Sequence, residues 1–136
     1  MGVVLDSSVL MHAERRELNV DQMLTWLSSK KIEEVAMSTI SLMEFAHGIE
    51  RLKSDRAQSV SESFMADLIL AIPVLPVSAA IAIRAGRLDG SLRKAGITIG
   101  MADGLIAATA LDAGFGVATL NGRHFKMVPG LDVVEL

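Results

Sequence analysis

The sequence of 136 residues contains no cysteine and no tyrosine, a single tryptophan and three prolines. Without cysteine the chain forms no disulfides, offers no thiolate ligands for zinc and has no cysteine nucleophile. Aromatic residues make up only 4% of the chain, so it has little surface on which nucleobases can stack. The lack of cysteine fits a reducing compartment, and we predict a cytoplasmic protein.

Long apolar runs and an excess of basic residues are also missing. The longest apolar-rich segment, residues 68–85, is interrupted by Pro73, Pro76 and Arg84, so it does not match a membrane span. The apolar run at the start covers only residues 3–5, which is too short for a signal peptide. The net charge is −3, so a nucleic-acid partner requires a local basic patch. We expect no membrane partner.

What the sequence does contain is an alternation of strand and helix patterns. Half of the residues are apolar, which suits one core and a single domain over residues 1–136. Helical spacing of apolar residues alternates with short β-branched or extended runs near residues 2–5, 35–37, 73–77, 116–120 and 131–136. This order predicts an α/β fold, a parallel sheet flanked by helices on both faces.

Three predicted helices have distinctive features. Residues 41–53 and 55–71 have no strand signal between them, so they predict an inserted helical hairpin. Asp55 is the expected cap of the second of these helices, whose apolar stripe is Ala57, Val60, Phe64, Leu68 and Ile72. Residues 99–113 are apolar nearly all round and predict a central, buried helix that ends at Gly114.

Acidic or amide side chains occur at four places where a strand ends or within the first turns of a helix. Asp6 and Asn121 follow predicted strands, whereas Glu44 and Asp103 lie in predicted helices. Carboxylates in apolar surroundings are costly to bury alone. A divalent cation stabilises such a cluster, and oxygen ligands suit Mg²⁺ or Mn²⁺. If these side chains converge, the chain is a metal-dependent hydrolase; if they do not, it is an α/β domain without that chemistry.

Each of the four residues also has a purely structural interpretation. Asp6 would cap the helix that follows it, and Asp103 would be favoured by the dipole of a first helical turn. Glu44 lies opposite the apolar stripe of its helix, which predicts either a surface position or one that lines a solvent-filled cleft. Asn121 would serve the turn that it forms with Gly122.

Further residues near these positions are candidates for supporting the site or binding substrate. Thr119 either ends its strand or orients a ligand or a water molecule. Arg123 follows the same strand together with His124, and one of these two side chains is expected to contact phosphate. Ser8 and Asn121 complete the set of supporting residues.

Four segments, taken together, resemble those of PIN-domain ribonucleases, and more closely those of VapC-type toxins of bacterial and archaeal toxin–antitoxin pairs. They are VVLDSSVL at residues 3–10, STISLMEFAHGI at 38–49, GMADGLIAA at 100–108, and TLNGRHF at 119–125 followed by PGL at 129–131. Each segment alone is a weak signal, but their order and spacing cover almost the full chain.

The resemblance implies a three-layer, PIN-like fold in which Asp6, Glu44 and Asp103 together bind Mg²⁺ or Mn²⁺ and cleave RNA. It also implies a homodimer, and inhibition by a cognate antitoxin whose C-terminal segment enters the cleft. Many relatives have a fourth acidic residue in the last segment. Here that segment reads Asn-Gly-Arg-His, so the fourth carboxylate is absent, and occupancy of a second metal site is in question.

The working hypothesis is metal-assisted hydrolysis of RNA, with Glu44 acting as a base toward water. One alternative is a catalytically inactive PIN-like module that binds protein through its helical hairpin, which the missing acid favours. A second alternative is a phosphatase with Asp6 as nucleophile. Such enzymes usually have a second aspartate two residues on, where this chain has Ser8.

Overall fold

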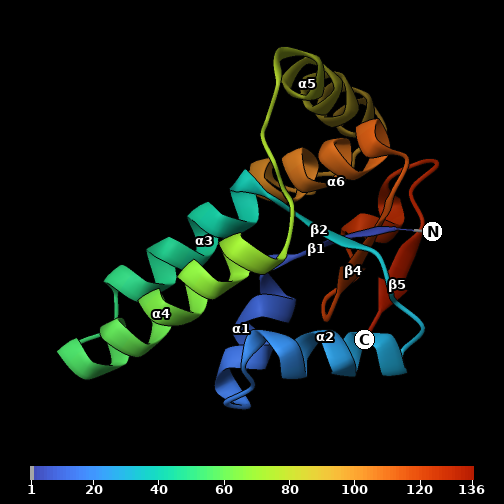
Figure 1. Ribbon diagram of the computed structural model, residues 1–136. Helices are drawn as coiled ribbons and strands as arrows, with labels where there is room; N and C mark the ends of the chain where they lie inside the picture. The colour runs from blue at the N-terminus through green and yellow to red at the C-terminus, as the bar shows by residue number, and fades with distance from the viewer. Residues whose placement is uncertain (1) are drawn as a thin grey trace.

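The computed structural model describes residues 2–136, which contain one five-stranded sheet of parallel strands in the order β3-β2-β1-β4-β5 (Figure 1). In β1, Val3 pairs with Val35 of β2 on one side and with Gly116 of β4 on the other. Every predicted strand position is confirmed, and the carboxyl ends of all strands lie at one edge. The strands are β1 (Val3–Leu5), β2 (Val35–Ser38), β3 (Val74–Leu75), β4 (Gly116–Thr119) and β5 (Val133–Glu135).

Helices cover both faces of this sheet, as predicted. Side chains alternate between the two faces of a strand: Val3 and Leu5 belong to one core cluster and Val4 to another. Helices α1 and α2 pack below the sheet in Figure 1, whereas α6 packs above it and α5 lies outside α6. The helices are α1 (Ser7–Arg15), α2 (Val20–Ser29), α3 (Thr39–Glu50), α4 (Asp55–Ala71), α5 (Ala79–Lys94) and α6 (Met101–Ala113), with a short 3₁₀ turn η1 (Phe125–Met127).

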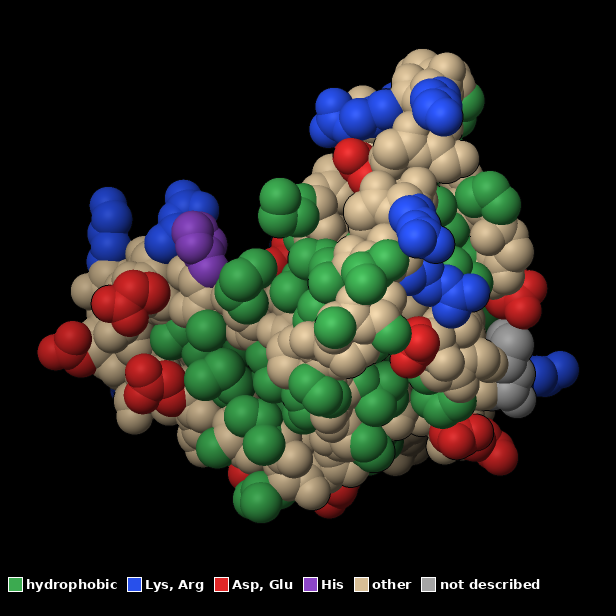
Figure 2. All heavy atoms as spheres, turned by 90° about the horizontal axis from the view of Figure 1, so that it is seen from above, with side chains coloured by type: hydrophobic (Ala, Val, Ile, Leu, Met, Phe, Trp, Pro, Cys, Tyr) green, Lys and Arg blue, Asp and Glu red, His purple; other side chains and the backbone are tan. Residues whose placement is uncertain are grey.

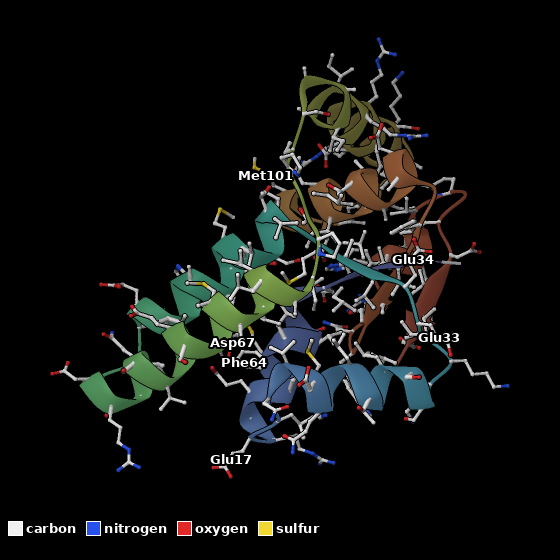
Figure 3. All side chains as sticks on the ribbon, in the orientation of Figure 1. Glu17, Glu33, Glu34, Phe64, Asp67 and Met101 are labelled. Atoms are coloured by element: carbon white, nitrogen blue, oxygen red, sulfur yellow. The ribbon has the colours of Figure 1, made fainter. Side chains whose placement is uncertain are left out.

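The predicted helical hairpin is formed by α3 and α4, which extend together away from the sheet (Figure 1). Phe45 and Phe64 join the two helices, with ring centroids 5.9 Å apart. Figure 3 shows Phe64 on the side of α4 that faces α1. The expected cap was wrong, because Ser54 rather than Asp55 accepts the N–H of Ala57, and Asp55 is the first helical residue.

The predicted stripe of α4 is also wrong at one position, because Val60 is 60% exposed. Phe64, Leu68 and Ile72 are buried as expected. Val60 instead lines a solvent-open groove together with Glu14 and Arg15 of α1. The buried part of the stripe therefore begins at Phe64.

Helix α6 begins at Met101 rather than at Ile99, because Gly100 adopts φ 89° and ψ 156° directly before it. This conformation is open almost only to glycine and interrupts helical geometry. Met101 is 83% exposed, so the first residue of the helix is not part of the predicted buried surface. The rest of the helix is central, with Ile106 and Ala107 fully buried, and Gly114 ends it with φ 71°.

No helix in residues 2–136 combines the length and apolarity needed to cross a membrane.

Candidate functional site

Asp6 stands at the carboxyl end of β1 and is 6% exposed. Its Oδ1 accepts the backbone N–H of Ser7 at 2.9 Å, so it is the N-cap of α1. Its Oδ2 accepts hydrogen bonds from the hydroxyls of Ser8 and Thr119, each at 2.8 Å. The capping role and a place in a site therefore coexist, and the carboxylate is held in one orientation by the start of α1 and the end of β4.

Ser8 and Thr119 form a small hydrogen-bonded network between the ends of β1 and β4. The Ser8 hydroxyl oxygen accepts the N–H of Leu120 at 3.1 Å, and the Thr119 hydroxyl oxygen accepts the N–H of Asn121 at 2.9 Å. Thr119 is fully buried. Asn121 thus joins the network through its backbone, while its side chain is exposed.

Glu44 is a partly buried residue of α3, the helix that follows β2, and its side chain reaches the start of α1. Its Oε1 accepts a hydrogen bond from the Ser7 hydroxyl at 3.0 Å. Burial raises the pKa of Glu44 above its ordinary value, the Ser7 hydrogen bond lowers it, and the charges of Asp6 and Asp103 raise it further. The position opposite the apolar stripe is therefore one that faces other carboxylates.

Asp103 lies in the first turn of α6, and its side chain is 29% exposed. Its Oδ2 stands 3.0 Å from Nδ1 of His124, in the loop after β4. Burial raises the pKa of Asp103, and so does the charge of Asp6, whereas the hydrogen bond and the charge of His124 lower it. The position of Asp103 in the first helical turn fits an interaction with the helix dipole. The negative charge of Asp6 also acts on the Asp103 carboxyl group.

Together, Asp6, Glu44 and Asp103 come from β1, α3 and α6 and act on one another electrostatically. Among the residues described, none of the three forms an ion pair with Lys or Arg. The donors are all carboxylate oxygens, the chemistry that suits Mg²⁺ or Mn²⁺. In the arrangement seen over residues 2–136, however, no three acidic, histidine or cysteine side chains are placed to hold one metal ion.

Of the residues that take part in this arrangement, Ser7 was not predicted, and His124 was predicted only as an alternative to Arg123 for contacting phosphate. Ser7 holds Glu44, and His124 holds Asp103. For His124 a signal existed, because it occupies the segment where the similar family has its fourth acid. For Ser7 the sequence offered none, because only the fold brings α3 beside the start of α1.

Arg123 is exposed in the loop that follows β4. With His124 it lines a cavity of about 220 Å³ beside Asp103, between this loop and the turn that precedes α6. Arg123 therefore lies near the carboxylates without contacting them.

Comparison with known proteins gives a consistent result. The family model described as PIN domain matches residues 3–131. Ribonuclease VapC1 of Rickettsia felis is 30% identical over 136 residues, covering 100% of this chain and 97% of that protein. The structure of VapBC2 from Rickettsia felis bound to a promoter DNA fragment aligns with TM-score 0.84 at 23% identity, covering 100% of this chain and 99% of that one. DNA-bound VapBC from Salmonella typhimurium aligns with TM-score 0.80 at 25% identity, covering 99% and 98%.

Proposed function

Since the chain belongs to the PIN-domain family, in its VapC-type branch, we propose that it is a divalent-metal-dependent endoribonuclease and the toxin of a toxin–antitoxin pair. The observation that carries this proposal is the meeting of Asp6, Glu44 and Asp103 at one sheet edge, where burial and then the charge of neighbouring carboxylates raise the pKa values of Glu44 and Asp103. Such mutual repulsion, with no Lys or Arg partner among the described residues, is what a bound cation relieves.

Asp6, Glu44 and Asp103 are the residues that would hold Mg²⁺ or Mn²⁺. When bound, the cation supplies neutralisation of the phosphate charge and an activated water for hydrolysis. Closing a ligand set around an ion would require Glu44 and Asp103 to exchange their partners Ser7 and His124 for the ion, because the present arrangement holds no ready-made group of three ligands within residues 2–136. Asp6 is fixed by Ser8 and Thr119 and provides the rigid part of the site.

The protein's own groups then have separate tasks. Glu44 acts as the base toward the attacking water, a role supported by its partly exposed position beside Asp6 and Asp103. Arg123 is exposed beside the site and binds phosphate with its guanidinium group. Ser8, Thr119 and Asn121 keep the strand ends in register around Asp6.

The distribution of basic residues supports an RNA substrate despite the negative net charge. Figure 2 shows Lys and Arg side chains on two projections of the surface, with a hollow between them; the left-hand projection is the α3–α4 hairpin. Basic groups on either side of a hollow suit a strand that carries a phosphate at each nucleotide. The exposed basic residues of the hairpin region are Arg51, Lys53 and Arg56, and those of α5 include Arg84, Arg87 and Lys94.

The proposed partners are a cognate antitoxin and a second copy of the chain. A solved relative at 25% identity is a VapBC bound to DNA, which supports a protein partner for this chain as well. The antitoxin would enter the cleft at the carboxylates and block it.

The test is cleavage of single-stranded RNA by purified protein with and without Mn²⁺. We expect cleavage that EDTA abolishes, and that Asp6→Asn or Asp103→Asn removes while the far-ultraviolet circular dichroism stays unchanged. Both variants keep the size of the side chain but turn one acceptor oxygen into an NH₂ donor. The unchanged circular dichroism is therefore needed to assign a loss of activity to the missing carboxylate rather than to a disturbed fold. Wild-type cleavage rates in Asp103→Asn would remove this site from consideration.

One observation favours the alternative of a non-catalytic PIN-like binding module. His124, in the segment where many relatives have a fourth acid, engages Asp103 directly. If the purified protein binds an antitoxin but leaves RNA intact at every Mn²⁺ concentration, the alternative replaces the nuclease.

A further inference from the structure

A small cavity lies beside His124, the partner of Asp103, and of its lining only Arg123 takes part in the chemistry described above. It has a volume of about 220 Å³ and is lined by Gly96, Ile97, Thr98, Arg123, His124 and Met127. Its walls come from two loops: residues 95–100, between α5 and α6, and residues 120–127, after β4. Both loops also position the site, because the first leads to Asp103 and the second carries His124.

The lining combines apolar walls with hydrogen-bonding groups. Ile97 is partly buried and Met127 is 40% exposed, so both offer apolar surface. Thr98 contributes a hydroxyl that donates and accepts, and Arg123 contributes a planar guanidinium group with five N–H donors. An unpaired nucleobase has the matching properties: a flat apolar face and a polar edge.

The size and charge of the cavity narrow the ligand further. Cavities that bind drug-sized molecules have roughly 300–1,000 Å³, so 220 Å³ suits a single base better than a larger ligand. Arg123 gives the rim a positive charge, which complements the phosphates on either side of a base. Guanidinium planes also stack on bases in single-stranded RNA.

His124 connects this cavity to the carboxylates. Its Nδ1 contacts Asp103 at 3.0 Å, and the same ring lines the cavity. Only the His124 side chain therefore separates a base in the cavity from Asp103, one of the proposed metal ligands. We propose that the cavity between residues 95–100 and 120–127 binds one unpaired base of the RNA, from the nucleotide next to the cleaved phosphate. This inference rests on the proposed function and adds a specificity subsite to it.

The experiment measures RNA binding in EDTA, so that cleavage plays no part. A fluorescent single-stranded oligoribonucleotide is compared with a series in which one abasic position is moved along the strand. For the wild-type protein we expect binding to weaken about tenfold at one position, the size of effect given by one well-recognised base. In Thr98→Val and in Arg123→Met the effect at that position is expected to shrink, because each variant removes one of the two polar partners that the cavity offers to the base.

The matched control is Lys30→Met, which removes one exposed positive charge at the end of α2. It is expected to keep the full abasic effect. The proposal is overturned if every abasic position behaves alike in the wild-type protein, if the sensitive position is unchanged in both cavity variants, or if no RNA binds. Cleavage of the intact strand with Mn²⁺ is scored separately, so a cleaving protein without a sensitive position rejects the subsite and leaves the nuclease in place.

Discussion

At the scale of single residues, the three carboxylates of the site differ in how many hydrogen-bond partners hold them. Asp6 is satisfied by three hydrogen bonds and is nearly buried. Glu44 and Asp103 have one partner each, Ser7 and His124, and both pKa values are raised, first by burial. Asp6 is thus held in one orientation. For Glu44 and Asp103, the charged form carries a free-energy cost that a bound cation would remove.

That cost predicts a dependence of stability on pH. A carboxyl group with a raised pKa binds more protons in the folded than in the unfolded state, so the free energy of unfolding falls as the pH rises from the ordinary value to the raised one. At neutral pH the full penalty is present, and Glu44→Gln and Asp103→Asn remove it. Because both groups are partly solvated, we expect melting temperatures in EDTA only roughly 1–3 °C above wild type.

Differential scanning fluorimetry at several pH values checks this prediction. The advantage of both variants should vanish below about pH 4, where the carboxyls are protonated in either state. Mn²⁺ should reverse the order at neutral pH by stabilising only the wild-type protein. Amide variants less stable than wild type in EDTA at pH 7 would show that burial of these carboxylates and repulsion between them do not destabilise the wild-type protein.

At the scale of secondary-structure elements, the turn before α6 sets where Asp103 stands. Gly100 has φ 89° and ψ 156°, and the helix begins at the next residue. Gly96, four residues earlier, also has a positive φ of 78°. The two glycines reverse the chain between α5 and α6 and present the first turn of α6 to the sheet edge.

Gly100→Ala should therefore destabilise the protein by about 1–3 kcal/mol, because a side chain is strained in this backbone region even though the space around it is open. The control is Gly90→Ala, in the exposed interior of α5, where an added Cβ also meets nothing within 4 Å. That change should stabilise by about 0.5–1 kcal/mol. Urea unfolding measures both; equal effects of the two substitutions would contradict the role given to Gly100.

Much of this level was predictable from local sequence. Asn19, Ser38 and Ser78 cap helices through side-chain hydrogen bonds, the role typical of Asn and Ser directly before a helix. Errors arose where local and tertiary preferences differ. Asp55 and Ser54 are equally good caps by residue type, and Val60 continues the apolar period of α4. Contacts with the rest of the fold decide which of the two residues caps the helix and whether Val60 is buried.

At the scale of the whole molecule, the parallel sheet explains how residues 6 and 103 come to act together. Strands β1 and β4 are neighbours, so their carboxyl ends meet, and α3 and α6 start from the same edge. The sequence order of strands predicted this edge as the place of the site. It did not reveal that Ser7 would reach Glu44 or His124 would reach Asp103, because those contacts depend on loop paths between distant segments.

The surface also predicts association of two copies. Leu70 at the end of α4 and Met101 at the start of α6 are 86% and 83% exposed, which is costly for large apolar side chains in water. We expect sedimentation equilibrium to give twice the 14.5 kDa chain mass, and the double variant Leu70→Glu, Met101→Lys to shift the protein toward the single-chain mass. A wild-type protein that stays at the single-chain mass at all concentrations would contradict the homodimer.

The proposed nuclease activity depends on three carboxylates sharing one divalent cation. Calorimetric titration of the metal-free protein with Mn²⁺, repeated with Asp6→Asn, Glu44→Gln and Asp103→Asn, tests this most directly. We predict that the wild-type protein binds Mn²⁺ and that each variant weakens binding at least about tenfold, with affinity falling as the pH is lowered because the ligands must be deprotonated. Equal Mn²⁺ binding by all four proteins, or none by the wild type, would contradict the account.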